Sequence, residues 1–399
     1  MIIASPREVH SDVGEYSLGR LRAYKNSDHV YRRLVELHEL PQRSHKSARS
    51  LAEQVRACIV NAQEHFAAAS AVSHATKALH LYYGAMNYAL AVSIYKGGSD
   101  YRMDKLRKMH ASHGLTLSMS TSCNLQLDFR TLIQGMRAKA MYKSTSPESP
   151  PNPYGTFEVW RSQHREFPGA TRLKRYSSTA GWYTVQCVGK FVGNDMPPRP
   201  LPSTGISLEQ ALLSIPALAP RLASLGIPSD LVGASLMMYL PENQNGMLDI
   251  FVQPQPQFQQ HMAEFCKLLR FDEEAARHTT KKEYAYSACS YSIQLGEDAA
   301  VRGKIELPPI VYSTSLITYF SSKGWELGEF GAYYVALFIA GNIVRYYPDL
   351  WIPHIEADTE FAQVIEIVCS SAVERISVLA ASELDREQIV AFEFDPGRG

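Results

Sequence analysis

The sequence predicts an α+β fold that is predominantly α-helical, in which the N- and C-terminal regions form a helical bundle around a central α/β insertion. Two long apolar stretches, residues 70–96 and 327–347, have helical spacing and share paired tyrosines, small residues and a later asparagine. Alternating, β-rich segments follow a proline-rich break at residues 144–153. Because both apolar stretches must be buried, we expect them to pack together across the insertion.

These signals divide the chain into four regions. Residues 1–46 form an N-terminal helical segment, and residues 47–146 form the first part of the bundle. Residues 147–307 form the insertion, and residues 308–399 supply the C-terminal helices that complete the bundle. At 399 residues with 45% hydrophobic residues, the chain is long enough to bury a substantial core.

Residues 70–96 form the predicted central helix. No proline interrupts this stretch, and Gly97-Gly98 follows it as a stop signal. Apolar residues occupy most sides of the helix, and small residues such as Gly84 allow neighbouring helices to approach closely. We therefore expect the substitution Gly84→Leu to be strongly destabilising.

Other elements have local signatures. Residues 124–142 predict a further helix, and residues 155–160 alternate in the manner of a β-strand. Residues 234–239 and 247–252 predict a β-hairpin with its turn at Asn245-Gly246.

The charge distribution is asymmetric although the formal net charge is zero. Residues 1–200 contain 27 Lys and Arg against 15 Asp and Glu, whereas residues 201–399 contain 13 against 25. A basic half can bind an anionic partner such as RNA or DNA. The two halves can also attract each other within one chain or across a homodimer, and the dispersed basic residues leave both interpretations open.

Composition and motifs exclude several classes of protein. The six cysteines are scattered and form no C-x-x-C pair, which favours a reducing, cytoplasmic location. No apolar run is long enough to span a membrane. Phosphate-binding loops, dinucleotide fingerprints, nucleophile elbows and H-E-x-x-H motifs do not occur in the sequence, so we predict neither a cofactor nor a metal.

Four blocks of the sequence resemble a known family in their order and spacing. They are Tyr82-Tyr83, His113-Gly114-Leu115, Gly155-Thr156-Phe157 and residues 344–351, which contain Arg-Tyr-Tyr-Pro-Asp-Leu-Trp. They resemble the YaaC-like family of prokaryotic proteins over about residues 50–380. That family has no established activity, so the resemblance implies a fold more than a reaction.

A second resemblance is to HEPN domains, which are helical bundles. Residues 81–85, with their paired tyrosines, and His113-Gly114 fit the HEPN outline of a helix followed by a loop and another helix. Many HEPN proteins are metal-independent RNases or components of toxin and antiviral systems, and others are structural. The resemblance therefore implies, by analogy, a role in prokaryotic antiviral defence or stress response.

The candidate catalytic pair is Arg107 and His113. HEPN RNases use an arginine followed, after four to six residues, by a histidine, and Arg107 and His113 fit this spacing. In such a pair the arginine can stabilise charge on the phosphate and the histidine can move a proton. Similar spacings occur elsewhere in this chain, so the motif alone carries little information. Arg102, Lys105 and Lys108 surround Arg107 and are candidate nucleic-acid contacts, with a solvated basic turn as the alternative.

The candidate ligand site lies at the end of the second apolar stretch. Arg345 there is followed by Tyr346, a proline and Trp351, and it could neutralise helix carbonyls beneath a stacked Trp351. Alternatively, Arg345 could hold an anion in a cleft lined by Tyr346 and by His80 and Asn87 of the central helix.

Our leading hypothesis is a protein that acts by binding nucleic acid or a partner protein of the same defence or stress-response system. A metal-independent ribonuclease of HEPN type is the alternative. A structural scaffold without nucleic-acid contact is the third hypothesis.

Overall fold

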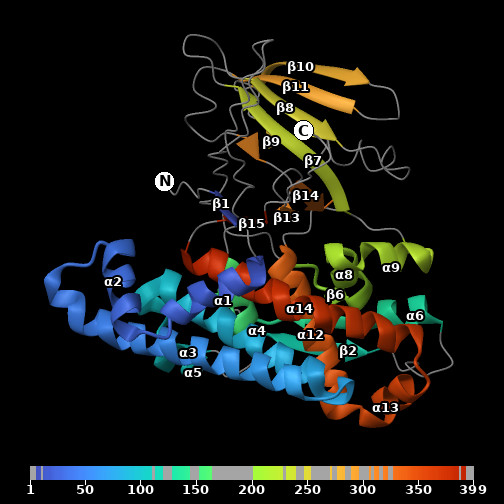
Figure 1. The fold of residues 1–399 in the computed structure, drawn as a ribbon, viewed down its shortest axis with the longest axis horizontal. Helices are drawn as coiled ribbons and strands as arrows, with labels where there is room; N and C mark the ends of the chain where they lie inside the picture. The colour runs from blue at the N-terminus through green and yellow to red at the C-terminus, as the bar shows by residue number, and fades with distance from the viewer. Residues whose placement is uncertain are drawn as a thin grey trace.

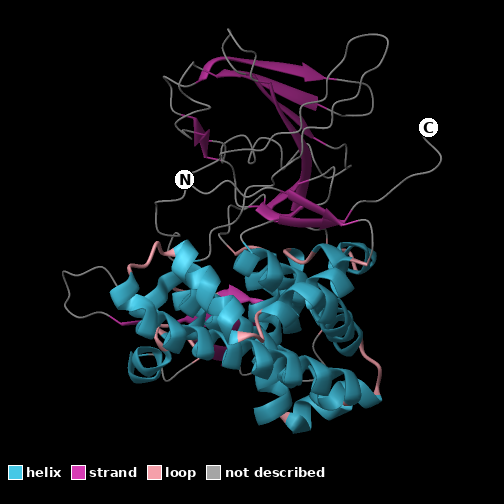
Figure 2. Cartoon of the chain, turned by 60° about the vertical axis from the view of Figure 1, so that its left-hand side comes forward, coloured by secondary structure: helices cyan, strands magenta, loops and turns pink. Residues whose placement is uncertain are grey.

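The fold is α+β and predominantly α-helical, as the sequence predicts. The computed structural model describes residues 6–9, 12–109, 113–119, 128–143, 152–163, 201–227, 327–385 and 388–391, and the strand segments 231–239, 247–252, 270–271, 276–283, 289–295, 305–306, 310–313 and 318–321. In both views the long helices form one body, and a larger sheet lies on one side of it (Figures 1 and 2).

Helices α3 (His45–Ala71) and α4 (His74–Gly97) form a long helical hairpin. The extended backbone of Val72 separates them, so the central helix begins at His74 and not at residue 70 as predicted. At its other end Gly98 adopts a φ of 58° and ends the helix, in agreement with the stop signal.

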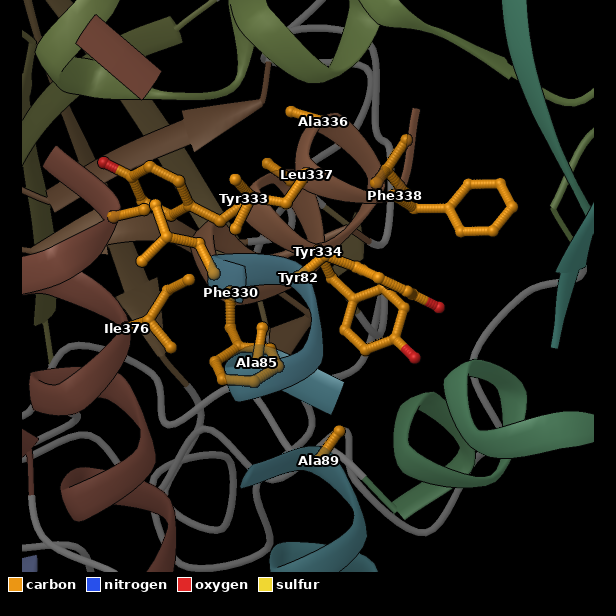
Figure 3. Packing of buried hydrophobic residues seen from close by; sticks show 14 of the residues in the cluster. Tyr82, Ala85, Ala89, Phe330, Tyr333, Tyr334, Ala336, Leu337, Phe338 and Ile376 are labelled. Atoms are coloured by element: carbon orange, nitrogen blue, oxygen red, sulfur yellow. The ribbon is translucent and has the colours of Figure 1, made fainter. Parts of the chain in front are cut away.

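The predicted contact between the two apolar stretches is confirmed. Helix α12 (Glu329–Tyr346) packs along α4 and is buried along almost its entire length. Tyr82 of α4 faces Tyr334 and Phe338 of α12, with ring centroids 5.5 Å apart in both pairs (Figure 3). Helices that are apolar on most sides must be covered on most sides, which explains why both lie at the centre of the body.

The last long helix, α14 (Glu360–Asp385), joins both ends of the described chain to this core. It packs against α4 and against α1 (Val13–Ala23). The carboxylate of Asp385 accepts hydrogen bonds from Arg20 Nε at 2.6 Å and from the hydroxyl of Tyr24 at 2.9 Å. Helices from the N- and C-terminal regions therefore form a single body, as their blue and red ribbons show (Figure 1).

The remaining helices are shorter and complete the helical body. The α-helices are α2 (Ser27–Leu37), α5 (Met103–Met109), α6 (Phe129–Gly135), α7 (Gly155–Gln163), α8 (Leu208–Leu213), α9 (Ala219–Ser224) and α13 (Pro348–Glu356), and the 3-10 helices are η1 (Gln42–Ser44), η2 (Gly98–Tyr101) and η3 (Pro216–Leu218).

A three-stranded antiparallel sheet lies within the helical body. Its order is β2 (Leu115–Met119), β3 (Met136–Ala140) and β6 (Ile206–Ser207). The helix predicted over residues 124–142 is present as α6 but wrong in its second half, because β3 pairs with β2 there, and residues 124–127 lie outside the described residues. The strand predicted over residues 155–160 is also wrong, since these residues open α7 and are buried.

The strand pairing of the predicted hairpin is confirmed, and its turn at Asn245-Gly246 lies outside the described residues. Strand β7 (Leu231–Tyr239) pairs antiparallel with β8 (Met247–Val252), from Ala234 opposite Val252 to Tyr239 opposite Met247. Both belong to a six-stranded antiparallel sheet with the order β10-β11-β8-β7-β14-β13. The other four strands are β10 (Ala276–Glu283), β11 (Cys289–Leu295), β13 (Ile310–Ser313) and β14 (Thr318–Ser321).

Three two-stranded pairs complete the described elements. Strand β1 (Pro6–Val9) lies parallel to β15 (Gln388–Ala391), which brings segments near the two ends of the chain together. The other pairs are antiparallel and join β4 (Tyr142–Lys143) to β5 (Asn152–Pro153) and β9 (Arg270–Phe271) to β12 (Ile305–Glu306).

Candidate functional site

A group of polar side chains gathers where the ends of α3, α4 and α12 meet the loop before β2. We call it the Arg345 cluster and define it as His65, His80, Tyr83, His113 and Arg345. Tyr83 is the centre of the cluster. Arg345 hydrogen-bonds to its hydroxyl, the rings of His65 and His113 contact its ring, and His80 contacts His65. Residues from positions 65 to 345 thus converge because the two apolar helices pack side by side.

The central contact joins Arg345 to Tyr83. Arg345 Nη1 donates a hydrogen bond of 2.8 Å to the hydroxyl of Tyr83. Because a guanidinium can only donate, the Tyr83 oxygen accepts, and the Tyr83 O–H stays a donor. Arg345 is exposed, and no carboxylate among the described side chains lies within ion-pair distance of it. The two groups therefore present several hydrogen-bond donors and one uncompensated positive charge.

An aromatic ring covers the arginine, but it is not the predicted one. The Arg345 guanidinium carbon lies 5.0 Å from the ring centroid of Tyr346, within cation–π range. The stacking expected from Trp351 does not occur. Trp351 is buried, its Nε1 donates to the backbone oxygen of Ala75 at 3.1 Å, and its ring packs edge-on against Phe361. Trp351 thus anchors α13 on α4 and does not line a ligand cleft.

Tyr83 also stacks on His65, which in turn contacts His80. Its ring lies 5.5 Å from that of His65 at an interplanar angle of 29°, and His65 lies 6.0 Å from His80. Burial, and then the charge of His80, lower the pKa of His65 below its ordinary value. The Nδ1 atom of His80 is buried and has no hydrogen-bond partner among the described residues. His65 therefore supplies a neutral imidazole at neutral pH.

His113 approaches the same tyrosines from the loop before β2. Its ring packs edge-on against Tyr82 and Tyr83, and its Nδ1 lies 3.1 Å from the Met86 sulfur. A thioether can only accept, so we assign the ring proton to Nδ1 and the free lone pair to Nε2. Burial, and then the charge of Arg345, lower the pKa of His113, which keeps it neutral at neutral pH.

The backbone around His113 explains the His-Gly pair in the sequence. The His113 carbonyl accepts the backbone N–H of Phe157 at 3.3 Å, which ties this loop to the first turn of α7. Gly114 has a φ of 83°, and a Cβ there would lie 2.9 Å from the Phe157 nitrogen. Only glycine fits this close approach without strain, so Gly114 fixes the position of His113.

Asn87 was predicted to line the ligand cleft, but the structure gives its side chain internal partners. Its Nδ2 donates to the Tyr83 carbonyl at 2.8 Å, and its Oδ1 accepts from Asn61 Nδ2 at 3.0 Å. Asn87 is also buried. Its amide therefore links α4 to α3 below the Arg345 cluster and supports the position of Tyr83.

The basic turn around α5 supplies the predicted nucleic-acid contacts Arg102 and Lys105. Arg102 Nε lies 3.3 Å from Asp104 and its Nη1 lies 3.4 Å from the Ser47 hydroxyl, while Lys105 lies 4.0 Å from Asp100. The backbone of Arg107 and Lys108 belongs to α5, but their side chains lie outside the described residues, as does any approach of Arg107 to His113. Both described cations have acidic neighbours, unlike Arg345.

Two members of the cluster were not identified as site residues from the sequence. Tyr83 was noticed only as part of the Tyr82-Tyr83 block, and His65 carried no local signal. Within the described ranges, no group of three or more His, Cys, Asp or Glu is placed to hold a metal ion. No helix there combines the length and the apolar character needed to cross a membrane.

Comparisons with known proteins add no relative to this picture. No protein-family model matches the chain, and neither a curated protein nor a solved structure matches it.

Proposed function

We propose that the protein acts by binding nucleic acid, with the Arg345 cluster as its phosphate-binding site. The observation that carries this proposal is the environment of Arg345. This exposed arginine is held by a neutral tyrosine hydroxyl, without a carboxylate partner among the described side chains. An arginine fork that lacks an internal anion fits the planar, bidentate geometry of a phosphate.

The groups beside Arg345 support the same ligand. The Tyr83 O–H is available as a second donor, and burial, with the charge of Arg345, lowers the pKa of the half-buried His113, so that Arg345 carries the positive charge of the cluster. The basic surplus of residues 1–200 adds long-range attraction for a polyanion. These features favour nucleic acid over a neutral ligand.

The substitution Arg345→Met tests the proposal. It keeps most of the apolar stem but removes the charge and the donor fork. Because Arg345 is exposed, we expect the variant to stay folded while its affinity for a fluorescent oligonucleotide falls and its salt dependence becomes less steep. Binding measured by fluorescence anisotropy at several salt concentrations gives both quantities.

Arg49→Met is the matched control. Arg49 is also exposed, and its guanidinium lies 4.4 Å from the ring centroid of Tyr31, but unlike Arg345 it has an acidic partner, since its Nη1 lies 3.5 Å from Asp28. The substitution therefore removes the same charge and cation–π contact from an arginine that already has an internal anion. We expect it to leave oligonucleotide affinity nearly unchanged. An equal loss in both variants would contradict a specific site at Arg345, and binding of no nucleic acid would leave a partner-binding or scaffold protein.

A metal-independent ribonuclease remains the second candidate, because one observation favours it. His113 offers a neutral imidazole whose Nε2 carries a free lone pair beside the proposed phosphate site, as a general base requires. RNA cleavage that persists in chelator and disappears in His113→Asn would support this activity. The resemblance to HEPN domains is consistent with either role in a prokaryotic antiviral defence or stress-response system.

A further inference from the structure

We infer that the ligand of this site is single-stranded nucleic acid, whose unpaired bases stack on Tyr346 and Tyr347 while Arg345 holds an adjoining phosphate. This inference rests on the function proposed above. The observation behind it is the exposure of these two rings. Among the described residues only four large hydrophobic side chains are exposed, and Tyr346 and Tyr347, at 59% and 40%, are the two most exposed.

The exposed tyrosines are held by a rigid backbone. Tyr347 is both the C-cap of α12 and the N-cap of α13, so a single residue separates the two helices. Its N–H bonds to the Ile343 carbonyl at 2.9 Å, and its carbonyl accepts the N–H of Trp351 at 3.0 Å. The buried Trp351 side chain then ties α13 to the Ala75 carbonyl. A fixed backbone lowers the entropy lost when a ligand binds, so these rings are suited to act as a platform.

The adjacent cation identifies the class of ligand. An exposed aromatic pair alone would suit an apolar protein segment as well as a base. Here the guanidinium of Arg345 lies 5.0 Å from the Tyr346 ring centroid and has no anionic partner in the part of the chain that is described. An exposed aromatic ring beside an unpaired cation, with a second exposed ring at the next position of the chain, matches a ligand that alternates planar bases with phosphates.

The form of the nucleic acid follows from the stacking. In a duplex both faces of each base are already covered by neighbouring bases, whereas an unpaired base has a face free to stack on an aromatic side chain. The platform therefore discriminates against duplex, although Arg345 could contact the phosphates of either form. Stacking also tolerates any base, so we expect little dependence on sequence.

The experiment compares oligothymidine with a duplex of the same length, using the wild-type chain and the variants Tyr347→Ala and Tyr347→Phe. Tyr347 is chosen because, among the described residues, Arg345 contacts the ring of Tyr346 and the hydroxyl of Tyr83 but not Tyr347, so Tyr347→Ala leaves the proposed phosphate-binding donors intact. We expect tighter binding to the single strand, about 5- to 150-fold weaker single-strand binding by Tyr347→Ala, and near wild-type binding by Tyr347→Phe.

Two controls separate the outcomes. Leu18→Ala removes another exposed apolar side chain, at 37% exposure, and should leave binding unchanged. Quenching of a 2-aminopurine base on binding, lost in Tyr347→Ala, would report the stacking directly. Equal affinity for both forms, or a Tyr347→Ala variant that binds like wild type while Arg345→Met is impaired, would overturn this inference but leave the proposed function intact. If the wild-type chain binds neither form, both fail.

Discussion

Replacing Gly84 by alanine should destabilise the protein, because Gly84 of α4 packs closely against Phe66 and Ala62 of α3. A Cβ atom at position 84 would lie 2.6 Å from two ring carbons of Phe66 and 3.4 Å from the Ala62 carbonyl oxygen. Favourable carbon contacts occur at about 3.5–4.0 Å, so the ring would have to move by roughly 1 Å. Phe66 is itself buried, which leaves it little room to move.

The magnitude follows from a comparison with Gly19. Gly19 lies within α1, and a Cβ there would meet nothing within 4 Å. Alanine is favoured over glycine in a helix interior by about 1 kcal/mol, so Gly19→Ala should stabilise the protein by that amount. Gly84→Ala gains the same helix propensity but suffers overpacking that costs about 1–3 kcal/mol. The free energies of unfolding of the two variants should therefore differ by about 1–3 kcal/mol, and Gly84→Leu should be worse.

Urea denaturation followed by far-UV circular dichroism measures this difference as a shift in midpoint. A second variant identifies the responsible contact, since Phe66→Leu should relieve part of the cost of Gly84→Ala. The double-mutant cycle should then show a coupling of about 0.5–3 kcal/mol. Equal stabilisation by Gly84→Ala and Gly19→Ala would refute the close contact between α3 and α4 at Gly84.

Two further predictions concern Trp351 and the histidines. Trp351→Phe removes the hydrogen bond to Ala75 and should cost about 1–3 kcal/mol of stability, while oligonucleotide affinity should fall far less than in Arg345→Met; a folded variant that no longer binds would instead place Trp351 in the ligand site. Burial lowers the pKa of His113 and of His354 below 6.5, so the unfolded chain takes up their protons first as pH falls. The free energy of unfolding should therefore be highest above about pH 6.5 and should fall as the pH drops from there toward the pKa values of the two histidines in the folded protein. Urea midpoints measured over this range should depend less on pH in His113→Asn than in wild type.

The sequence predicted the elements whose apolar residues follow a clear pattern, because such a pattern fixes which sides of the element are buried. Residues 329–346 are apolar on every side, and such a helix must be buried whatever surrounds it. Residues 155–160 misled the prediction for a related reason. All of them are buried in α7, so their β-favouring Phe157, Val159 and Trp160 show no helical alternation of apolar and polar positions. Residues 136–140 favour a helix locally, but pairing with β2 overrides that preference.

The candidate site was predictable only where its chemistry lies within one segment. Arg345 stands out because a charged residue follows a long apolar run, and Tyr346 adjoins it. Tyr83 and His65 join Arg345 through the packing of three helices, and no local pattern encodes that proximity. For the same reason the sequence misplaced Trp351 beside Arg345, because its hydrogen-bond partner Ala75 lies 276 positions earlier in the chain.

The packing of α12 on α4 also has a consequence for synthesis on the ribosome. Roughly 250 residues separate the end of α4 at Gly97 from the end of α12 at Tyr346. Because the ribosome adds about 5–20 residues per second, roughly 12–50 s pass between the synthesis of α4 and the synthesis of α12, which covers it. During that interval the apolar surface of α4 is exposed in the nascent chain, which is the condition that recruits chaperones. A chain stalled before residue 329 should therefore aggregate or remain chaperone-bound, whereas one released after residue 385 can close its core.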